Sequence, residues 1–133
     1  MTDAISQAEL VRVIADVLEM GHVENVVAMF KEDPALHLLV GDLIRDQRYM
    51  VRLGVAVLFE ELVAARPAEA AQAVPALIPL LAEEDPFLRG EAATVLGIIG
   101  GPLALAAVAR LTADPDPQVA LIAQELAGEA STP

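Results

Sequence analysis

The sequence predicts an all-α protein whose helix pairs stack into a right-handed superhelix, an α–α solenoid of about four helix pairs. Apolar residues recur at spacings of three and four, as on a helix, rather than at the spacing of two that a strand requires. The hydrophobic 56% of the 133 residues comes from Ala, Leu and Val, with only 3% aromatic residues, and such side chains favour closely packed helices. A chain of this length is expected to form one domain over residues 1–133.

Eight helices are expected from these spacings and from the residues that delimit them. They cover residues 4–20, 23–32, 34–45, 48–65, 68–83, 86–100, 102–113 and 117–128. Asp followed by Pro begins three of them, at Asp33, Asp85 and Asp116, because Asp accepts hydrogen bonds from the free amides of a first turn and Pro fits there. Gly21 and Gly100 end the first and the sixth, since glycine tolerates the left-handed conformation of a helix end.

The fifth helix, the C-terminal tail and the first helix each have a feature beyond their boundaries. In the fifth helix, Pro75 and Pro79 remove backbone hydrogen bonds, so we expect a kink there or a late start near Val74. The tail, residues 129–133, is expected to fray. The inner face of the first helix is expected to consist of Leu10, Val13, Ile14, Val17 and Leu18.

The sixth helix has counterparts at similar distances on both sides. Its inner face is formed by Leu88, Ala92, Val95, Leu96 and Ile99. Moving back 37 positions gives Val51, Val55, Leu58, Phe59 and Leu62, and moving forward 31 positions from the first four gives Val119, Ala123, Leu126 and Ala127. Arg89 also maps to Arg52 and Gly97 to Gly128. The clearest repeats are therefore residues 34–66, 74–100 and 102–128.

The segment VPALIPLLAEEDPFLRGEAATVLGIIG, residues 74–100, resembles a HEAT repeat of the short bacterial and archaeal type named for phycobilisome lyase subunits. The matching residues are Pro75, Leu80, Leu81, Asp85, Leu88, Arg89, Ala92, Ala93, Leu96, Gly97, Ile99 and Gly100. The resemblance is strong over residues 74–128, fair over 34–66 and only generic before that. It implies a ladder of polar contacts between stacked pairs. Arg48 stands where the repeat has Asp and Ala120 where it has Arg, so the ladder is expected to be interrupted at both ends.

Five residues are expected to hold the stack together, namely Asp85, Arg89, Gly97, Gly100 and Asp116. An Asp cap contributes about 1 kcal/mol by accepting amide hydrogen bonds. Arg89, one turn after Asp85, is expected to reach Asp85 or the cap of a neighbouring repeat. A catalytic role for Asp85 and Arg89 is the alternative, and it is disfavoured because the same type of pair stands at comparable points of other repeats.

The composition argues against several functional classes. No Cys is present, which removes thiolate chemistry and disulfides, and no nucleotide-binding, hydrolase or calcium-loop motif occurs. His22 and His37 lie 15 positions apart on different helices, so they are expected to be cap or surface residues rather than metal ligands. We expect no catalytic residue, no metal and no cofactor.

Charge bears on partners and location. The chain has 8 basic and 20 acidic residues, and its net charge of −12 repels phosphate backbones and anionic lipids. Residues 92–109 are uncharged over 18 positions, a length that a membrane helix needs, but Gly100-Gly101-Pro102 in their middle indicates a turn. The N-terminal MTDAISQAEL has no basic segment followed by an apolar one, so no secretory signal is visible and a cytoplasmic location is expected.

One stripe on each second helix of a pair is expected to face away from the repeat core. The stripes are Met50, Gly54, Val57 and Glu61; Phe87, Glu91, Thr94 and Ile98; and Gln118, Ile122 and Glu125. Five of these residues are large and apolar. They are either covered by neighbouring repeats or form an apolar groove with an acidic rim, a patch that typically binds another protein.

Arg45, Arg48 and Arg52 form a local concentration of positive charge around Tyr49. Their spacing places them on one side of their helices, where they either bind a carboxylate or phosphate of a partner or pair with acids of this chain such as Asp46.

These features favour a non-catalytic protein-binding scaffold or adaptor that uses the concave face of a short helical solenoid. The candidate contact residues are Arg48, Met50, Arg52, Val57, Glu61, Phe87, Glu91, Thr94, Ile98, Ile122 and Glu125. Another protein is the expected partner, and self-association into a homo-oligomer stays open. The resemblance implies a first alternative, an accessory subunit or relative of a chromophore lyase. A second, HEAT-like nucleic-acid binding, is opposed by the net charge of −12.

The charge generates a direct prediction. We expect no retention of labelled duplex DNA or RNA in a gel-shift assay at low salt, where phosphate contacts are strongest, because the acidic surface repels the backbone. Retention under these conditions would restore nucleic-acid binding as a function.

Overall fold

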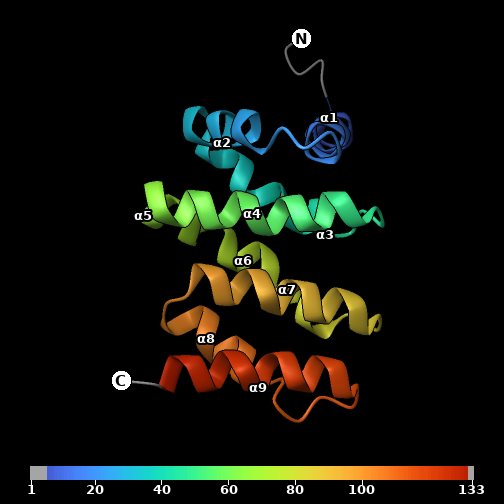
Figure 1. Cartoon of the computed structure of the whole chain (residues 1–133), viewed down its shortest axis with the longest axis vertical. Helices are drawn as coiled ribbons and strands as arrows, with labels where there is room; N and C mark the ends of the chain where they lie inside the picture. The colour runs from blue at the N-terminus through green and yellow to red at the C-terminus, as the bar shows by residue number, and fades with distance from the viewer. Residues whose placement is uncertain (1–5, 132–133) are drawn as a thin grey trace.

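A computed structural model of the chain describes residues 6–131 as helices stacked in one row (Figure 1). The α-helices are α1 (Gln7–Glu19), α2 (Val23–Glu32), α3 (Val40–Ile44), α4 (Tyr49–Ala65), α5 (Pro67–Ala70), α6 (Val74–Leu77), α7 (Pro86–Ile99), α8 (Pro102–Ala109) and α9 (Pro117–Ser131). The 3₁₀ helices are η2 (Pro34–Leu39), η3 (Ala71–Ala73) and η4 (Ile78–Ala82). No strand occurs among the described residues.

The three long helices α4, α7 and α9 lie side by side, and each begins at the same edge of the stack, on the right in Figure 1. Behind them, α3 packs on α4, α6 and η4 pack on α7, and α8 packs on α9. Above this array, α1 and α2 both contact α4. Figure 1 shows α1 nearly end-on, so it crosses the direction of α4. The predicted all-α solenoid of stacked helix pairs is confirmed.

The buried core follows the predicted register. Along α4 it contains Val51, Val55, Leu58, Phe59 and Leu62, and along α7 Leu88, Ala92, Val95 and Leu96. On α9 it continues with Val119 and Ala123. Since these are the positions that the shifts of 37 and 31 residues relate, the inner faces of successive pairs form one continuous core.

Glycines allow two pairs of helices to approach closely. A Cβ atom built on Gly97 of α7 would lie 2.5 Å from Cδ2 of Leu126 on α9, and one on Gly54 of α4 would lie 3.1 Å from Cβ of Leu18 on α1. Both distances are shorter than an ordinary carbon–carbon contact. Gly97 is therefore the stacking residue that the sequence predicts, whereas Gly54, expected on an outward stripe, is buried beneath α1.

The turn predicted within residues 92–109 is confirmed. Gly100 and Gly101 have φ angles of 72° and 89°, in the left-handed region that glycine adopts without strain. They end α7 and are followed by α8, which starts at Pro102. Among the described residues, no helix has both the length and the apolar composition that crossing a bilayer requires.

His37 corrects the expectation of a cap or surface histidine. Its ring is fully buried, with centroids 5.0 Å from Phe30 and 5.9 Å from Phe59. Nδ1 lies 2.7 Å from the Pro34 carbonyl oxygen, an acceptor that an α-helix would use for a backbone amide. This competition fits the observation that residues 34–39 form the 3₁₀ helix η2, where one longer α-helix was expected. His22, in contrast, is exposed at the N-cap of α2.

Other boundaries also differ from expectation. Residues 67–82 alternate between α and 3₁₀ segments, as two prolines within one helix require, so the predicted interruption is confirmed. Val13 was expected on the inner face of α1 but is exposed, and Ala15 is buried in its place. α8 ends four residues earlier than expected (109 rather than 113). α9 continues to Ser131, so the expectation that the chain frays from residue 129 is wrong for residues 129–131. Residues 132–133 lie outside the described range.

The contact at Gly97 generates a prediction. Gly97→Val should destabilise the chain by about 1–3 kcal/mol, because the added methyl groups overlap Leu126 in a packed interface. Chemical denaturation followed by circular dichroism measures this change. Gly128→Val is the matched control, since a Cβ atom there meets nothing within 4 Å. Equal effects of the two substitutions would show that the α7–α9 approach does not depend on a glycine.

Candidate protein-binding surface

The edge at which α4, α7 and α9 begin is polar, and it fixes how the helices start. Asp85 accepts a hydrogen bond from the Phe87 amide at 2.9 Å. Asp116 accepts from the amides of Gln118 and Val119 at 2.9 and 3.1 Å. Both predicted N-caps are therefore present. Arg48 occupies the corresponding position of α4 and makes no such cap.

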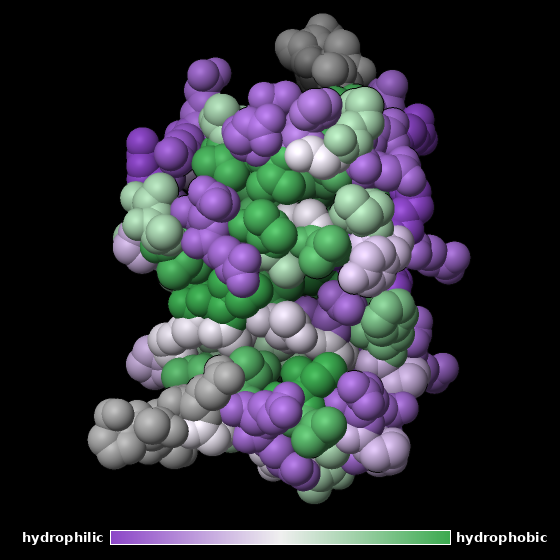
Figure 2. Space-filling view, in the orientation of Figure 1, coloured by the Kyte–Doolittle hydropathy of each residue, from purple (hydrophilic) through white to green (hydrophobic). Residues whose placement is uncertain are grey.

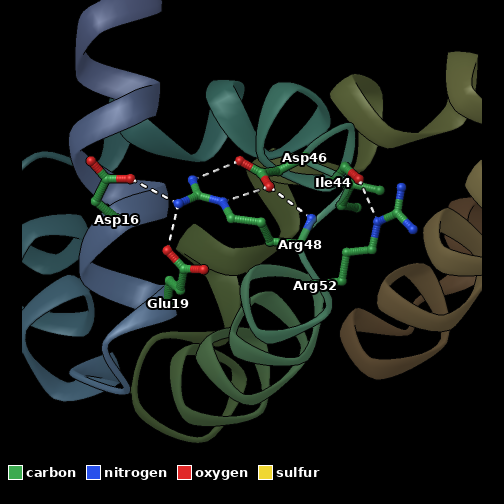
Figure 3. Close-up of polar contacts among 6 residues, drawn as sticks. All are labelled: Asp16, Glu19, Ile44, Asp46, Arg48 and Arg52. Atoms are coloured by element: carbon green, nitrogen blue, oxygen red, sulfur yellow. Dashed lines mark hydrogen bonds and ion pairs between the residues drawn. The ribbon is translucent and has the colours of Figure 1, made fainter.

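Arg48 instead joins three carboxylates (Figure 3). Its Nη1 donates to Asp16 at 3.0 Å and to Glu19 at 2.6 Å, both on α1, while Nε and Nη2 donate to the two carboxylate oxygens of Asp46 at 3.0 and 2.9 Å. The hydrogen bond from Arg48 is the main reason that the pKa of Asp46 lies below its ordinary value. Arg48 was expected to interrupt the polar ladder, but it links α1 to α4 through different partners.

Arg89 makes the corresponding link between α7 and the last pair. Its Nε and Nη2 donate to both carboxylate oxygens of Asp114, at 2.9 and 2.8 Å, and Nη1 donates to the carbonyls of Glu83 and Glu84 at 2.8 and 3.1 Å. The expected partners were Asp85 or a neighbouring cap. Asp114 precedes the cap Asp116 by two residues and accepts a hydrogen bond from the Asp116 amide at 2.9 Å. Its carboxylate therefore binds both Arg89 and the backbone of its own loop.

A regularity emerges that the sequence reading missed. Asp46, Glu83 and Asp114 each stand two residues before the start position of a long helix, at 48, 85 and 116, and each accepts hydrogen bonds from an arginine. The signal in the sequence is an acid two residues before the start position of each long helix. Arg45 is the donor to Glu83, at 2.6 Å.

Arg52 corrects another expectation, because its side chain is only 7% exposed. Its Nε donates to the Ile44 carbonyl at 3.2 Å, and its guanidinium carbon lies 4.1 Å from the centroid of the Phe87 ring (Figure 3 shows the Ile44 bond). Glu83, the acid of the next pair, is occupied by Arg45. Arg52 therefore stacks under an aromatic ring between α4 and α7 and is not available to a partner.

The remaining outward stripes lie on a surface that we call the α4–α7–α9 face. Met50 is 45% exposed and Phe87 51%, whereas Leu53, which the sequence reading omitted, is 43% exposed. Glu61 and Glu125 are exposed. The partly exposed members are Val57, Glu91, Thr94, Ile98 and Ile122. Figure 2 shows hydrophobic residues gathered over the middle of this side, with hydrophilic residues along the edge where the long helices begin.

Two hollows lie on this side. The α2–α4 groove, of about 580 Å³, is lined by Gly21, Val23, Glu24, Val27, Ala28, Lys31, Val57 and Glu61. The α7–α9 cleft, of about 400 Å³, is lined by Pro86, Phe87, Gly90, Glu91, Asp116, Gln118, Val119 and Ile122. Both have mainly apolar walls and acidic side chains at the rim, so each presents a surface suited to an amphipathic segment.

Within the described part of the chain, no three His or acidic side chains come close enough to hold one metal ion. The candidate contact residues offer shape, apolar area and charge. Burial raises the pKa of Glu91, one of these residues, and the nearby charge of Arg52 partly lowers it again.

The Arg89–Asp114 pair generates a pH prediction. Because the hydrogen bond from Arg89 lowers the pKa of Asp114 in the folded state, its stabilisation is present above the ordinary Asp value of about 3.9 and is lost as the pH falls below it. Asp114→Asn should lower Tm at pH 7, and the difference from wild type should shrink below about pH 4. Glu83→Gln, at a more exposed pair, should lower Tm less. A pH-independent difference would contradict the assignment.

Comparison with known proteins agrees with this geometry. The family of HEAT repeats matches residues 39–127, which is more than half of the chain and spans α4, α7 and most of α9. No curated protein and no solved structure matches. The family match concerns HEAT repeats in general, and the phycobilisome-lyase type stays a resemblance. The family match agrees with the stacked pairs, the repeated register and the polar edge, and the chain belongs to the HEAT-repeat family.

Proposed function

We propose that the chain is a non-catalytic protein-binding scaffold whose partner docks on the α4–α7–α9 face. Solenoids of stacked helix pairs offer extended surfaces of this kind, and HEAT repeats commonly serve as interaction scaffolds. The partner is expected to bury the exposed middle of the face and leave its acidic rim in water, as at typical protein interfaces.

The observation that supports this proposal most directly is the exposure of large apolar side chains on adjacent helices. Met50, Leu53 and Phe87 each leave more than two fifths of their surface in water. Burying such a side chain contributes roughly 1.5–3 kcal/mol. The exposed parts of these side chains add no buried area to the core of the chain. Their grouping on adjacent helices therefore supports a surface that binds a partner.

A paired substitution tests the face. Met50→Glu with Leu53→Glu should abolish capture of a specific partner from an extract of the source cells, because two charges enter the apolar centre of the interface. Quantitative mass spectrometry of captured proteins gives the readout. Since both side chains are exposed, Tm is expected to change little.

The matched control is Leu38→Glu with Leu103→Glu, which places the same charges on two exposed apolar residues of η2 and α8 in the second layer. Partners that bind the α4–α7–α9 face should survive this control. If the same proteins are lost in both variants, or retained in both, the face is not the docking site.

A further inference from the structure

The α7–α9 cleft differs from the rest of the face in combining an aromatic wall with a partly buried acid. Phe87 and Glu91 lie one turn apart on α7 and line one side, and Ile122 of α9 lines the other. Gly90 leaves room between the two sides of the cleft, because a Cβ atom there would lie 3.3 Å from Cδ1 of Ile122. Asp116 and Gln118 stand where α9 begins, at the mouth.

Glu91 has no ion-pair partner within the described residues. The guanidinium of Arg52, whose charge acts on Glu91, is directed to the Ile44 carbonyl and to the ring of Phe87. Burial raises the pKa of Glu91, which means that its charged form is poorly solvated where it stands. A carboxylate in such a place gains more from an added cation than a fully exposed one does, because the pair is less screened by water.

The α2–α4 groove provides the contrast. Its rim contains Lys31 together with Glu24 and Glu61, so a positive charge of this chain already stands among its acids. The lining of the α7–α9 cleft contains acids and no basic residue. The cleft is therefore the hollow whose charge is complementary to a cation, within a chain whose net charge is −12.

We propose that the α7–α9 cleft receives a lysine or arginine side chain from a basic, amphipathic segment of the partner protein. The methylene stem lies against Phe87 and Ile122, and the charged head pairs with Glu91. Apolar neighbours of that residue cover the exposed middle of the α4–α7–α9 face. This inference rests on the proposed function and specifies the chemistry of its partner.

Two physical reasons favour this occupant. Long basic side chains bury an apolar stem while presenting a charged end, which matches a cleft with an aromatic wall and an acid beside it. The net charge also attracts a basic segment from a distance and raises its association rate, so binding is expected to weaken as salt is added.

The test begins with a random peptide library displayed on phage and selected on the full chain. We expect the selected peptides to share a Lys or Arg flanked by apolar residues. The best peptide is then titrated by fluorescence anisotropy at low and physiological salt. Glu91→Gln should weaken its affinity by about tenfold, as the loss of a partly desolvated charge pair does.

The control must separate a specific pair from diffuse attraction to an acidic protein. Glu60→Gln removes one charge from an exposed position of α4 outside the cleft, and it should change the affinity by less than about twofold. Gln118→Lys provides a second cleft variant, because it places a cation at the mouth, and Gln72→Lys adds the same charge on exposed η3. Circular dichroism confirms that each variant is folded.

The outcomes are distinct. Loss of affinity in both cleft variants, with both controls unaffected, supports the proposal. Equal weakening by Glu91→Gln and Glu60→Gln shows diffuse attraction only and overturns it. Selected peptides without basic residues, or no selected peptide at all, also overturn it. The wider proposal of a protein-binding face is judged separately by the Met50 and Leu53 substitutions, so either can fail while the other stands.

Discussion

Each helix pair of this protein can cover its apolar side only by packing against the next pair. α7 shows the constraint most clearly, because it contacts α4 on one side and α9 on the other. Small residues on α7, including Ala92, Ala93 and Gly97, let its backbone approach both neighbours. Dispersion and hydrophobic burial along this row supply the stability, and they act only when the register between pairs is correct. The rest of the structure depends on that register.

The polar edge sets the register with directional contacts. Arg89 uses three nitrogens to bond Asp114 of the next pair and two carbonyls of its own loop, in a nearly buried position. A bidentate arginine–carboxylate pair restricts geometry as well as contributing energy, so it disfavours a shifted stack. Arg48 performs the same task toward α1 with a different acceptor set. The contacts specify how pairs meet, whereas the apolar core determines how strongly they hold.

The candidate binding surface consists of what stacking leaves uncovered. Phe87 belongs to both parts, since one side of its ring covers the Arg52 guanidinium while half of the residue is exposed to water. Glu91, one turn further along α7, lines the cleft beside this apolar surface and forms no ion pair with any residue that the structure describes. A recognition surface built on long helices is rigid, which lowers the entropic cost of binding a partner. The same helices that form the core therefore also present the face.

The sequence by itself determined the long helices, their stacking and the core register, because periodicity and Asp-Pro caps are local signals, whereas the 3₁₀ segments and the end of α8 differ from expectation. Only the tertiary structure decided which outward positions are covered. Gly54 and Glu91 occupy equivalent positions, 37 residues apart, yet Gly54 is buried against Leu18 of α1 while Glu91 lines an open cleft. The spacing of residues fixes the side of a helix on which a residue stands. What lies on that side depends on the neighbouring pairs. α1 crosses the direction of α4, whereas α4 and α9, the two neighbours of α7, run along it.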